Sequence, residues 1–221
     1  MTITIHHLHV SSSERVIWLC EEVGVDYELK TYNRSPLLAP PEYKSLHPAG
    51  TSPVIQDGDL TLAETAACIE YIAQKYANGK LFLTPTHPSY ADFLYWYHWA
   101  SGTFTPTVGR AMLVRAGGIP EDNLVAKLGS ERFKRGLLAL DNQLRDNTWL
   151  AGDDFTAADI MVVFPLTTMR YFFGYGFHDH VNIANYLKRV GEREAYQRAM
   201  KTGDPDLEPA LGLDHPKAFG A

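Results

Sequence analysis

Residues 46–76 read LHPAGTSPVIQDGDLTLAETAACIEYIAQKY, and this stretch predicts two strands followed by a helix. An Asp57-Gly58 pair between two short apolar runs is a strong signal for a hairpin. Beyond the hairpin, apolar residues recur at helical spacing: Ala66, Ile69, Ile72 and Tyr76. They form one stripe of an amphipathic helix, and Gly79 marks its end.

The chain before this stretch predicts a strand, a helix and a second strand. Residues 2–10, TITIHHLHV, have the pattern of a buried strand, and residues 26–32, DYELKTY, alternate like one. Between them, residues 14–24 carry apolar side chains on one helical face: Val16, Leu19, Cys20 and Val23. The first third of the chain is therefore predicted to have the order βαβ followed by ββα.

The rest of the chain predicts helices. Pro85 and Pro88 lie in a polar stretch that is typical of a linker, which we place at 81–90. Beyond it, helical patterns alternate with short loop-rich stretches, and the segment from Thr202 onward is rich in Pro and Gly. We therefore expect an α/β domain over 1–80 and an all-α domain over 91–221.

Composition and charge exclude several classes of function. The chain has 221 residues, of which 45% are hydrophobic, so it can bury a sizeable core. Its net charge is −6, and the sequence lacks the basic runs that bind nucleic acid or anionic lipids. With neither a signal-peptide pattern nor a membrane-spanning run, we expect a cytoplasmic protein. Cys20 and Cys68 lie in apolar helical patterns and are expected to be buried, reduced thiols.

Three sequence features resemble the glutathione S-transferase family. Residues 46–76 resemble its glutathione-binding half, in which Asn/His-Pro-x-Gly-x-x-Pro precedes a hairpin and a helix that opens with Glu-Ser/Thr. Residues 149–166, WLAGDDFTAADIMVVFPL, resemble the signature of the family's helical domain. Ser11 and Arg15 match the Ser-x-x-x-Arg opening of its serine-type members. The resemblance spans nearly the whole chain and implies a thioredoxin-like α/β N-terminal domain followed by an all-α C-terminal domain.

Three consecutive serines precede the first helix, within HVSSSERVIWLCEE at 9–22. On the local sequence alone, Ser11 and Glu14 have the spacing of a capping box, so capping is favoured there. The resemblance implies instead that the Ser11 hydroxyl donates to the sulfur of glutathione and stabilises its thiolate. Ser13 is the alternative donor, because related sequences often carry a second serine there. With Ser12 and Ser11 in place of cysteine, glutaredoxin-like disulfide chemistry is disfavoured.

The resemblance also assigns residues to glutathione binding. Pro53 is expected to follow a cis peptide bond, and Ser52 to pair with the cysteinyl backbone of glutathione. Glu64 and Thr65 would hold the γ-glutamyl group, although Thr65 could equally cap the helix. Thr51 stands where many relatives have lysine, so the glycyl carboxylate needs another cation. The candidates left open are Lys44, His47 and Arg34.

The pocket for the electrophile is expected between the two domains, facing Ser11, with the second domain contributing side chains to it. Residues 90–104 carry aromatic side chains around most of a helix, and Tyr95, Trp99 or Phe104 could line a cleft or a dimer contact, although packing in the core is the expected fate of most. Arg110 and the segment 170–177 are weaker candidates. Strand alternation separates His6 from His7 and His9, so we expect no metal site there. Thr156 and Asp159 predict a helix N-cap.

Together these patterns indicate a glutathione transferase with glutathione as its co-substrate. The thiolate would attack an apolar electrophile in a detoxification reaction, by conjugation, dehalogenation or reduction of an organic peroxide, and the sequence does not separate these. The resemblance implies a homodimer. The alternative is a binding or regulatory module that keeps the fold without turnover.

Overall fold

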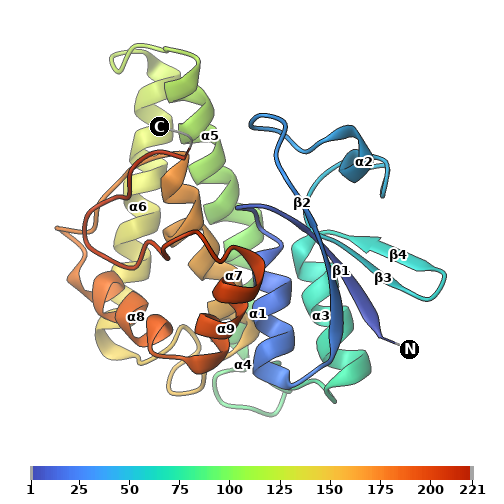
Figure 1. Ribbon diagram of the computed structural model, residues 1–221. Helices are drawn as coiled ribbons and strands as arrows, with labels where there is room; N and C mark the ends of the chain where they lie inside the picture. Colours follow the sequence, from blue (N-terminus) through green and yellow to red (C-terminus); the bar gives the residue numbers. More distant parts are fainter. Residues whose placement is uncertain (1, 220–221) are drawn as a thin grey trace. The chain divides into compact units, whose positions relative to one another are not determined.

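The structure is a computed structural model that describes residues 2–219, which form two compact units (Figure 1). The first unit comprises the chain up to Leu83 together with Gly191–Pro209. The second comprises Thr84–Val190 together with the chain from Ala210 onward. These units are defined by packing, and the domain limits at 1–80 and 91–221 stay a prediction.

A mixed four-stranded sheet in the order β2-β1-β3-β4 forms the centre of the first unit. Strand β1 (Ile3–Leu8) pairs in parallel with β2 (Tyr27–Tyr32) and antiparallel with β3 (Val54–Asp57), which pairs antiparallel with β4 (Leu60–Ala63). A crossover helix, α1 (Glu14–Val23), joins the parallel pair and packs beside α3 (Thr65–Tyr76). The predicted order βαβ followed by ββα is confirmed, with the short helix α2 (Pro41–Lys44) in addition.

The hairpin turn lies one residue later than the sequence pattern predicts. Asp57 pairs with Leu60, so the two loop residues are Gly58 and Asp59, and Gly58 has a φ of 60°. The Asp57 side chain points back toward α3, where it accepts hydrogen bonds from the hydroxyl of Tyr71 and the ammonium of Lys75. The bond from Lys75 is the largest of the contacts that hold the pKa of Asp57 below its usual value. These bonds fix Asp57 as the last strand residue and move the turn beyond it.

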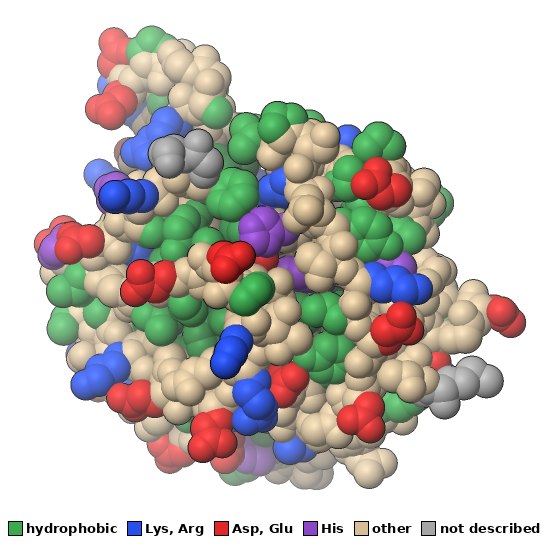
Figure 2. Space-filling view, viewed as in Figure 1, with side chains coloured by type: hydrophobic (Ala, Val, Ile, Leu, Met, Phe, Trp, Pro, Cys, Tyr) green, Lys and Arg blue, Asp and Glu red, His purple; other side chains and the backbone are tan. Residues whose placement is uncertain are grey.

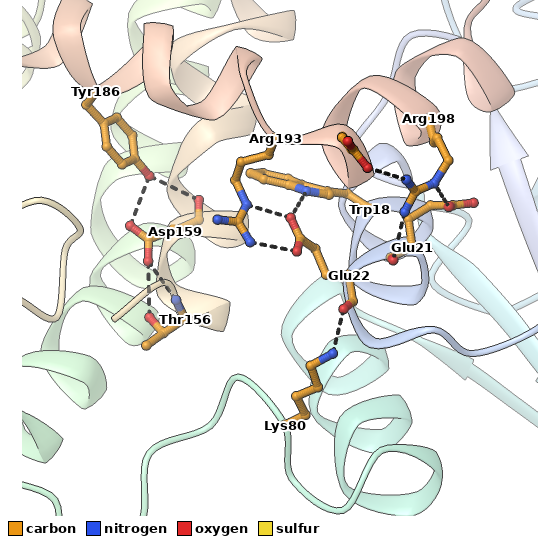
Figure 3. Close-up of polar contacts among 10 residues, drawn as sticks. Trp18, Glu21, Glu22, Lys80, Thr156, Asp159, Tyr186, Arg193 and Arg198 are labelled. Carbon is orange, nitrogen blue, oxygen red and sulfur yellow. Dashed lines mark hydrogen bonds and ion pairs between the residues drawn. The ribbon is translucent and has the colours of Figure 1, made fainter. Parts of the chain in front are cut away.

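A helix from far along the chain completes the first unit. Helix α9 (Glu194–Gly203) packs against α1, with the Trp18 and Tyr196 rings edge to face at 4.9 Å. Glu22 accepts two bonds from Arg193, each 2.7 Å long, and one from the Trp18 indole at 2.9 Å (Figure 3). Gly203 permits the close approach, because a Cβ there would lie 3.1 Å from Ile17 Cδ1.

The second unit is helical. Helix α4 (Tyr90–Trp99) continues through a π-helical turn, Ala100–Phe104, into α5 (Thr105–Ala116), which packs against α6 (Leu124–Asp146). Helix α7 (Ala157–Leu166) is buried along its whole length and packs against α4; a 3-10 turn, Thr168–Tyr171, and α8 (Val181–Gly191) follow.

The irregular segment after Ala210 is fixed to this unit by Arg170. This arginine is fully buried and donates hydrogen bonds to five backbone carbonyls, those of Tyr175, Ala210, Gly212, Leu213 and Asp214. Its guanidinium also lies 4.4 Å from the centre of the Phe177 ring. Arg170 and Phe177, which we considered for the electrophile pocket, therefore belong to the core.

The surface and the helices bear on the charge and the hydrophobicity of the chain. On the face that Figure 2 shows, acidic and basic side chains are interspersed without a large field of one sign. Within residues 2–219, we find no helix that is both long enough and apolar enough to span a bilayer.

Candidate functional site

The three serines lie in the turn that joins β1 to α1. Val10, just before them, has a φ of 51°, which is rare for a β-branched residue, and its amide donates to the Asp204 carboxylate at 3.0 Å. The turn buries the side chains of Ser11 and Ser13 and leaves Ser12 half-buried. Because α1 begins at Glu14, the serines lie at the positive end of its dipole.

The hydroxyl of Ser11 connects two separate segments of the first unit. Ser11 Oγ lies 2.8 Å from Ser13 Oγ and 2.8 Å from Ser52 Oγ, although Ser52 is 41 residues away in the chain. Ser12 Oγ donates to the Ser52 carbonyl at 2.8 Å. The peptide bond between Ser52 and the buried Pro53 is cis, as the sequence predicts. The structure therefore brings together Ser11, Ser13 and Ser52.

The capping box predicted at Ser11 requires a hydrogen bond from the Glu14 amide to the Ser11 hydroxyl, and this prediction is wrong. The Glu14 amide donates to the backbone carbonyl of Ser11 at 3.1 Å, while the Ser11 hydroxyl contacts the hydroxyls of Ser13 and Ser52. Ser13 occupies the N-cap position, and its hydroxyl faces His7 Nδ1 at 2.8 Å. His7 and Ser52 come from other elements, so the local sequence could not reveal their contacts with these serines.

Glu64 and Thr65 lie where β4 ends and α3 begins. Glu64 is exposed and has a φ of 73°, a conformation that a residue with a side chain rarely adopts outside functional sites. The predicted capping by Thr65 is wrong, because Thr65 is the first helical residue and its hydroxyl accepts a bond from the Arg15 guanidinium at 3.0 Å. Arg15 therefore links the start of α1 to the start of α3.

The three candidate cations differ in how they are engaged. The Arg34 guanidinium donates to the carbonyls of His9, Val10 and Leu37, and burial lowers its pKa. His47 Nδ1 accepts from the Ala49 amide at 3.1 Å. Lys44 is exposed, and its stem lies beside Gly50, where a Cβ would be 3.8 Å from Lys44 Cγ. This position is next to Thr51, which is exposed as well.

Sequence reasoning missed a buried pair behind the serines. His7 Nε2 lies 3.2 Å from Asp204 Oδ2, and both side chains are almost completely buried. Burial alone would raise the pKa of Asp204, but contacts with His7, the Val10 amide and His9 hold it below its usual value. Asp204 follows α9 in the chain, so only the packing of α9 on α1 could have identified this pair.

The other candidate ligands and nucleophiles have partners of a structural kind. His6 points to the opposite face of the sheet from His7, with Tyr32 Oη at 2.9 Å and Gln56 Oε1 at 3.0 Å, which confirms the alternation of the histidines. Cys20 and Cys68 are buried free thiols, and burial raises the pKa of each to about 12. Both thiols are therefore protonated near neutral pH.

Two of the expected pocket residues line a cavity within the helical unit. The cavity has a volume of about 430 Å³, and Trp99 and Arg110 contribute to it together with Arg132 and Arg135. Phe104 is buried in the core, where it stacks on Trp99 at 4.8 Å, which is the fate expected for most of these aromatic side chains. Tyr95 is 54% exposed.

Two family models match the chain. The model described as "Glutathione S-transferase, N-terminal domain" matches residues 11–75, and the one described as "Glutathione S-transferase, C-terminal domain" matches residues 104–194. The first of these matches includes Ser11, Ser52, Glu64 and Thr65.

Characterised relatives and solved structures agree with this match. Glutathione S-transferase 3 of Schizosaccharomyces pombe is 30% identical over 209 residues, which cover 87% of this chain and 84% of the relative. Glutathione S-transferase 3 of Zea mays is 34% identical over 151 residues, 66% of this chain and 68% of the relative. The structure of a glutathione S-transferase from Actinobacillus pleuropneumoniae superposes with a TM-score of 0.83 at 30% identity and covers 95% of this chain and 99% of its own. A family member from Pseudomonas fluorescens, solved with two glutathione bound, has a TM-score of 0.75 at 24% identity. The match covers 90% of this chain and 92% of the Pseudomonas fluorescens chain.

Proposed function

The chain belongs to the glutathione S-transferase family, and on that premise we propose that its first unit binds glutathione and activates it as a thiolate. The observation that carries this proposal is the 2.8 Å contact between Ser11 Oγ and Ser52 Oγ. It joins the hydroxyl expected to face the sulfur to the segment expected to hold the peptide backbone of glutathione. Family members solved with glutathione bound support the choice of co-substrate.

Ser11 is the proposed contact of the glutathione sulfur. A hydroxyl that donates to the sulfur favours the thiolate over the thiol, and the positive end of α1 acts in the same direction. A model thiol has a pKa of about 8.5, and helix N-termini are among the sites that lower it to about 7.5 or below. Ser13 is the alternative contact of the sulfur, and its hydroxyl lies 2.8 Å from the Ser11 hydroxyl.

The γ-glutamyl end of glutathione is assigned to the start of α3, and its glycyl end to Lys44. The Glu64 carboxylate would pair with the γ-glutamyl ammonium, and the amide of Thr65 at the start of α3 would hold the neighbouring carboxylate. Ser52 and Pro53 would hold the cysteinyl backbone, with Thr51 beside them. For the glycyl carboxylate we propose Lys44, because Arg34 donates to the carbonyls of His9 and Val10 and His47 accepts from the Ala49 amide.

The proposed acceptor is an apolar electrophile, and the reaction is conjugation, dehalogenation or reduction of an organic peroxide. The cavity of about 430 Å³ beside Trp99 has the size of a small-molecule site. The arginines that line it could contact a polar substituent of such an electrophile. A panel of halogenated arenes, enones and organic hydroperoxides assigns the reaction.

Calorimetric titration with glutathione tests the binding assignment. Replacing Glu64 by alanine removes a charge-assisted bond of about 1.5–3 kcal/mol and should weaken glutathione binding roughly 10- to 150-fold. Glu70→Ala is the matched control, because Glu70 is an exposed glutamate of α3, the helix that Glu64 precedes. Equal affinities of the wild type and Glu64→Ala, with a lower melting temperature for the variant, would show that Glu64 only supports the helix.

The assembly that we propose is a homodimer, as the family resemblance implies. Light scattering should report twice the subunit mass of 24.8 kDa over a wide range of concentrations. A mass of one subunit at every concentration contradicts this.

The alternative function is a binding or regulatory module without turnover. A protein that binds glutathione but turns over none of the electrophiles and hydroperoxides would support this alternative.

A further inference from the structure

A continuous line of hydrogen-bonding groups leads from Ser11 into the interior of the first unit. Ser11 Oγ contacts Ser13 Oγ at 2.8 Å, and Ser13 Oγ contacts His7 Nδ1 at 2.8 Å. On the other side of the imidazole, Nε2 lies 3.2 Å from Asp204 Oδ2. Ser11 is 5% exposed, His7 and Ser13 are fully buried, and Asp204 is 1% exposed. We call these four residues the buried relay.

The supply of protons fixes the direction of these bonds. A neutral imidazole carries one N–H. Asp204 Oδ2 lies 3.2 Å from Nε2 without hydrogen-bond geometry, but its negative charge favours the proton on that nitrogen, which leaves Nδ1 as an acceptor. Ser13 must then give its one proton to His7. The bond between the two serines is in that case donated by Ser11, so Ser11 has no proton left for a sulfur atom. In this state Ser11 can accept the proton of a thiol in place of the long bond, 3.4 Å, that its hydroxyl accepts from the Ser13 amide.

The direction reverses when His7 carries a second proton. An imidazolium donates from both nitrogens, so Nδ1–H donates to Ser13. Ser13 then donates to Ser11, and Ser11 donates outward to a thiolate. Ser52 fits both states, since its hydroxyl can donate to Ser11 throughout. The proton on His7 therefore decides whether Ser11 is matched to a thiol or to a thiolate.

We propose that the buried relay takes up the proton that glutathione loses when it becomes a thiolate, an inference that rests on the proposed function. The S–H bond breaks and its proton passes to Ser11 Oγ. The former proton of Ser11 passes to Ser13 Oγ, and that of Ser13 passes to His7 Nδ1. Both hydroxyls end with one proton each, and the net change converts a thiol and an imidazole into a thiolate and an imidazolium.

Asp204 is placed to stabilise the imidazolium. A buried cation requires a counter-charge, and this carboxylate faces His7 and His9 together. The Val10 amide donates to it at 3.0 Å, and the positive charge of Arg34 acts on it as well. These contacts keep Asp204 ionised, as its lowered pKa also indicates. His7 and Asp204 act through the serines, so they are positioning residues that also store the proton.

A structural role alone makes a different prediction. Asp204 ties the turn at Val10 to the end of α9, and His7 could be a hydrogen-bonded core histidine. In that case the thiol proton leaves for the solvent. Counting the protons released when glutathione binds therefore separates the two roles.

The experiment combines two measurements on the wild-type protein near pH 7.5, where free glutathione is mostly a thiol and an ordinary imidazole is mostly neutral. Ultraviolet difference absorbance gives the amount of thiolate formed on binding. Calorimetry in buffers of different ionisation enthalpy gives the number of protons released. S-methylglutathione, which has no thiol proton, is the control that subtracts protons from other groups. The relay predicts thiolate formation with almost no thiol proton released.

Each outcome has one meaning. About one proton released per thiolate formed overturns the relay and leaves glutathione activation intact. Binding without thiolate contradicts the proposed activation of glutathione and overturns the relay with it. Failure to bind glutathione at all removes the proposed function itself.

Variants add an independent check. His7→Asn keeps an acceptor near Nδ1 but cannot be protonated, so its thiolate should form at higher pH and release about one proton. His6→Asn alters a histidine on the opposite face of the same strand and should behave like the wild type. An unchanged thiolate titration in a folded His7→Asn protein overturns the proposal.

Discussion

Replacing Asp159 by alanine should strongly destabilise the helical unit. Asp159 is fully buried near the start of α7. Its Oδ2 accepts from the Thr156 amide at 2.9 Å and completes the predicted capping box, and its Oδ1 accepts from the Leu150 amide at 3.0 Å and the Tyr186 hydroxyl at 3.2 Å (Figure 3). One carboxylate therefore satisfies donors from three separate segments.

The size of the effect follows from these donors. Alanine removes the acceptor of two amides and two hydroxyls, those of Thr156 and Tyr186, and each unsatisfied group costs about 1–3 kcal/mol. Tyr186 also lies 3.5 Å from the Asp159 carbonyl, which offers it a partial substitute. We therefore expect a loss of about 3–5 kcal/mol, out of a total stability of roughly 5–15 kcal/mol for a typical protein. For a chain of this length, that loss lowers the melting temperature by roughly 6–20 °C.

Scanning calorimetry at pH 7.5 is the assay. Burial raises the pKa of Asp159 to about 6, so the carboxylate is ionised at this pH. Asp159→Asn keeps an oxygen for Leu150 and Tyr186 but turns an NH2 group toward the Thr156 amide, so its loss should be intermediate. Asp153→Ala, at an exposed aspartate of the preceding loop, should change the stability by less than about 0.5 kcal/mol. A melting temperature of Asp159→Ala within about 2 °C of the wild type refutes this reasoning.

Three further predictions concern other sites. Ser11→Ala should raise the pKa of bound glutathione in a thiolate titration, whereas Ser12→Ala should not, because the Ser12 hydroxyl binds the Ser52 carbonyl; equal titrations would exclude Ser11. Glu64→Gly should melt at the same or a higher temperature while binding glutathione more weakly, because glycine relieves about 1–2 kcal/mol of strain at a positive φ; a lower melting temperature contradicts this. Arg170→Lys should lose about 2–4 kcal/mol and speed hydrogen exchange after residue 210, because an ammonium cannot reach five carbonyls; unchanged exchange there argues against the anchoring role.

The fold could be predicted because its signals are local. The alternation in β1, the Gly58 turn and the stripe that includes Ile69 and Ile72 each depend on residues within one element. The hairpin was misplaced by one residue because α3 binds the Asp57 side chain, and this contact has no local signal.

The residues of the candidate site could also be predicted only where the signal is local. The sequence identifies Ser11, Ser52 and Glu64 through motifs, but it misses the pairing of His7 with Asp204. Nearly two hundred residues separate those two side chains, and they meet only because α9 packs on α1 next to Gly203. The alternation of β1 places His7 on the buried face but says nothing about its partner.

The division of the first unit into two stretches of chain has a consequence during protein synthesis. The ribosome adds Thr84–Val190, about 110 residues, between the two stretches, which takes about 5–20 s at usual rates. During that interval a nascent chain can pair its four strands, but α1 lacks α9 and His7 lacks Asp204. The apolar side of α1 is then open to chaperones and proteases. If the proposed relay is needed for glutathione activation, that activity becomes available only after translation has passed residue 204.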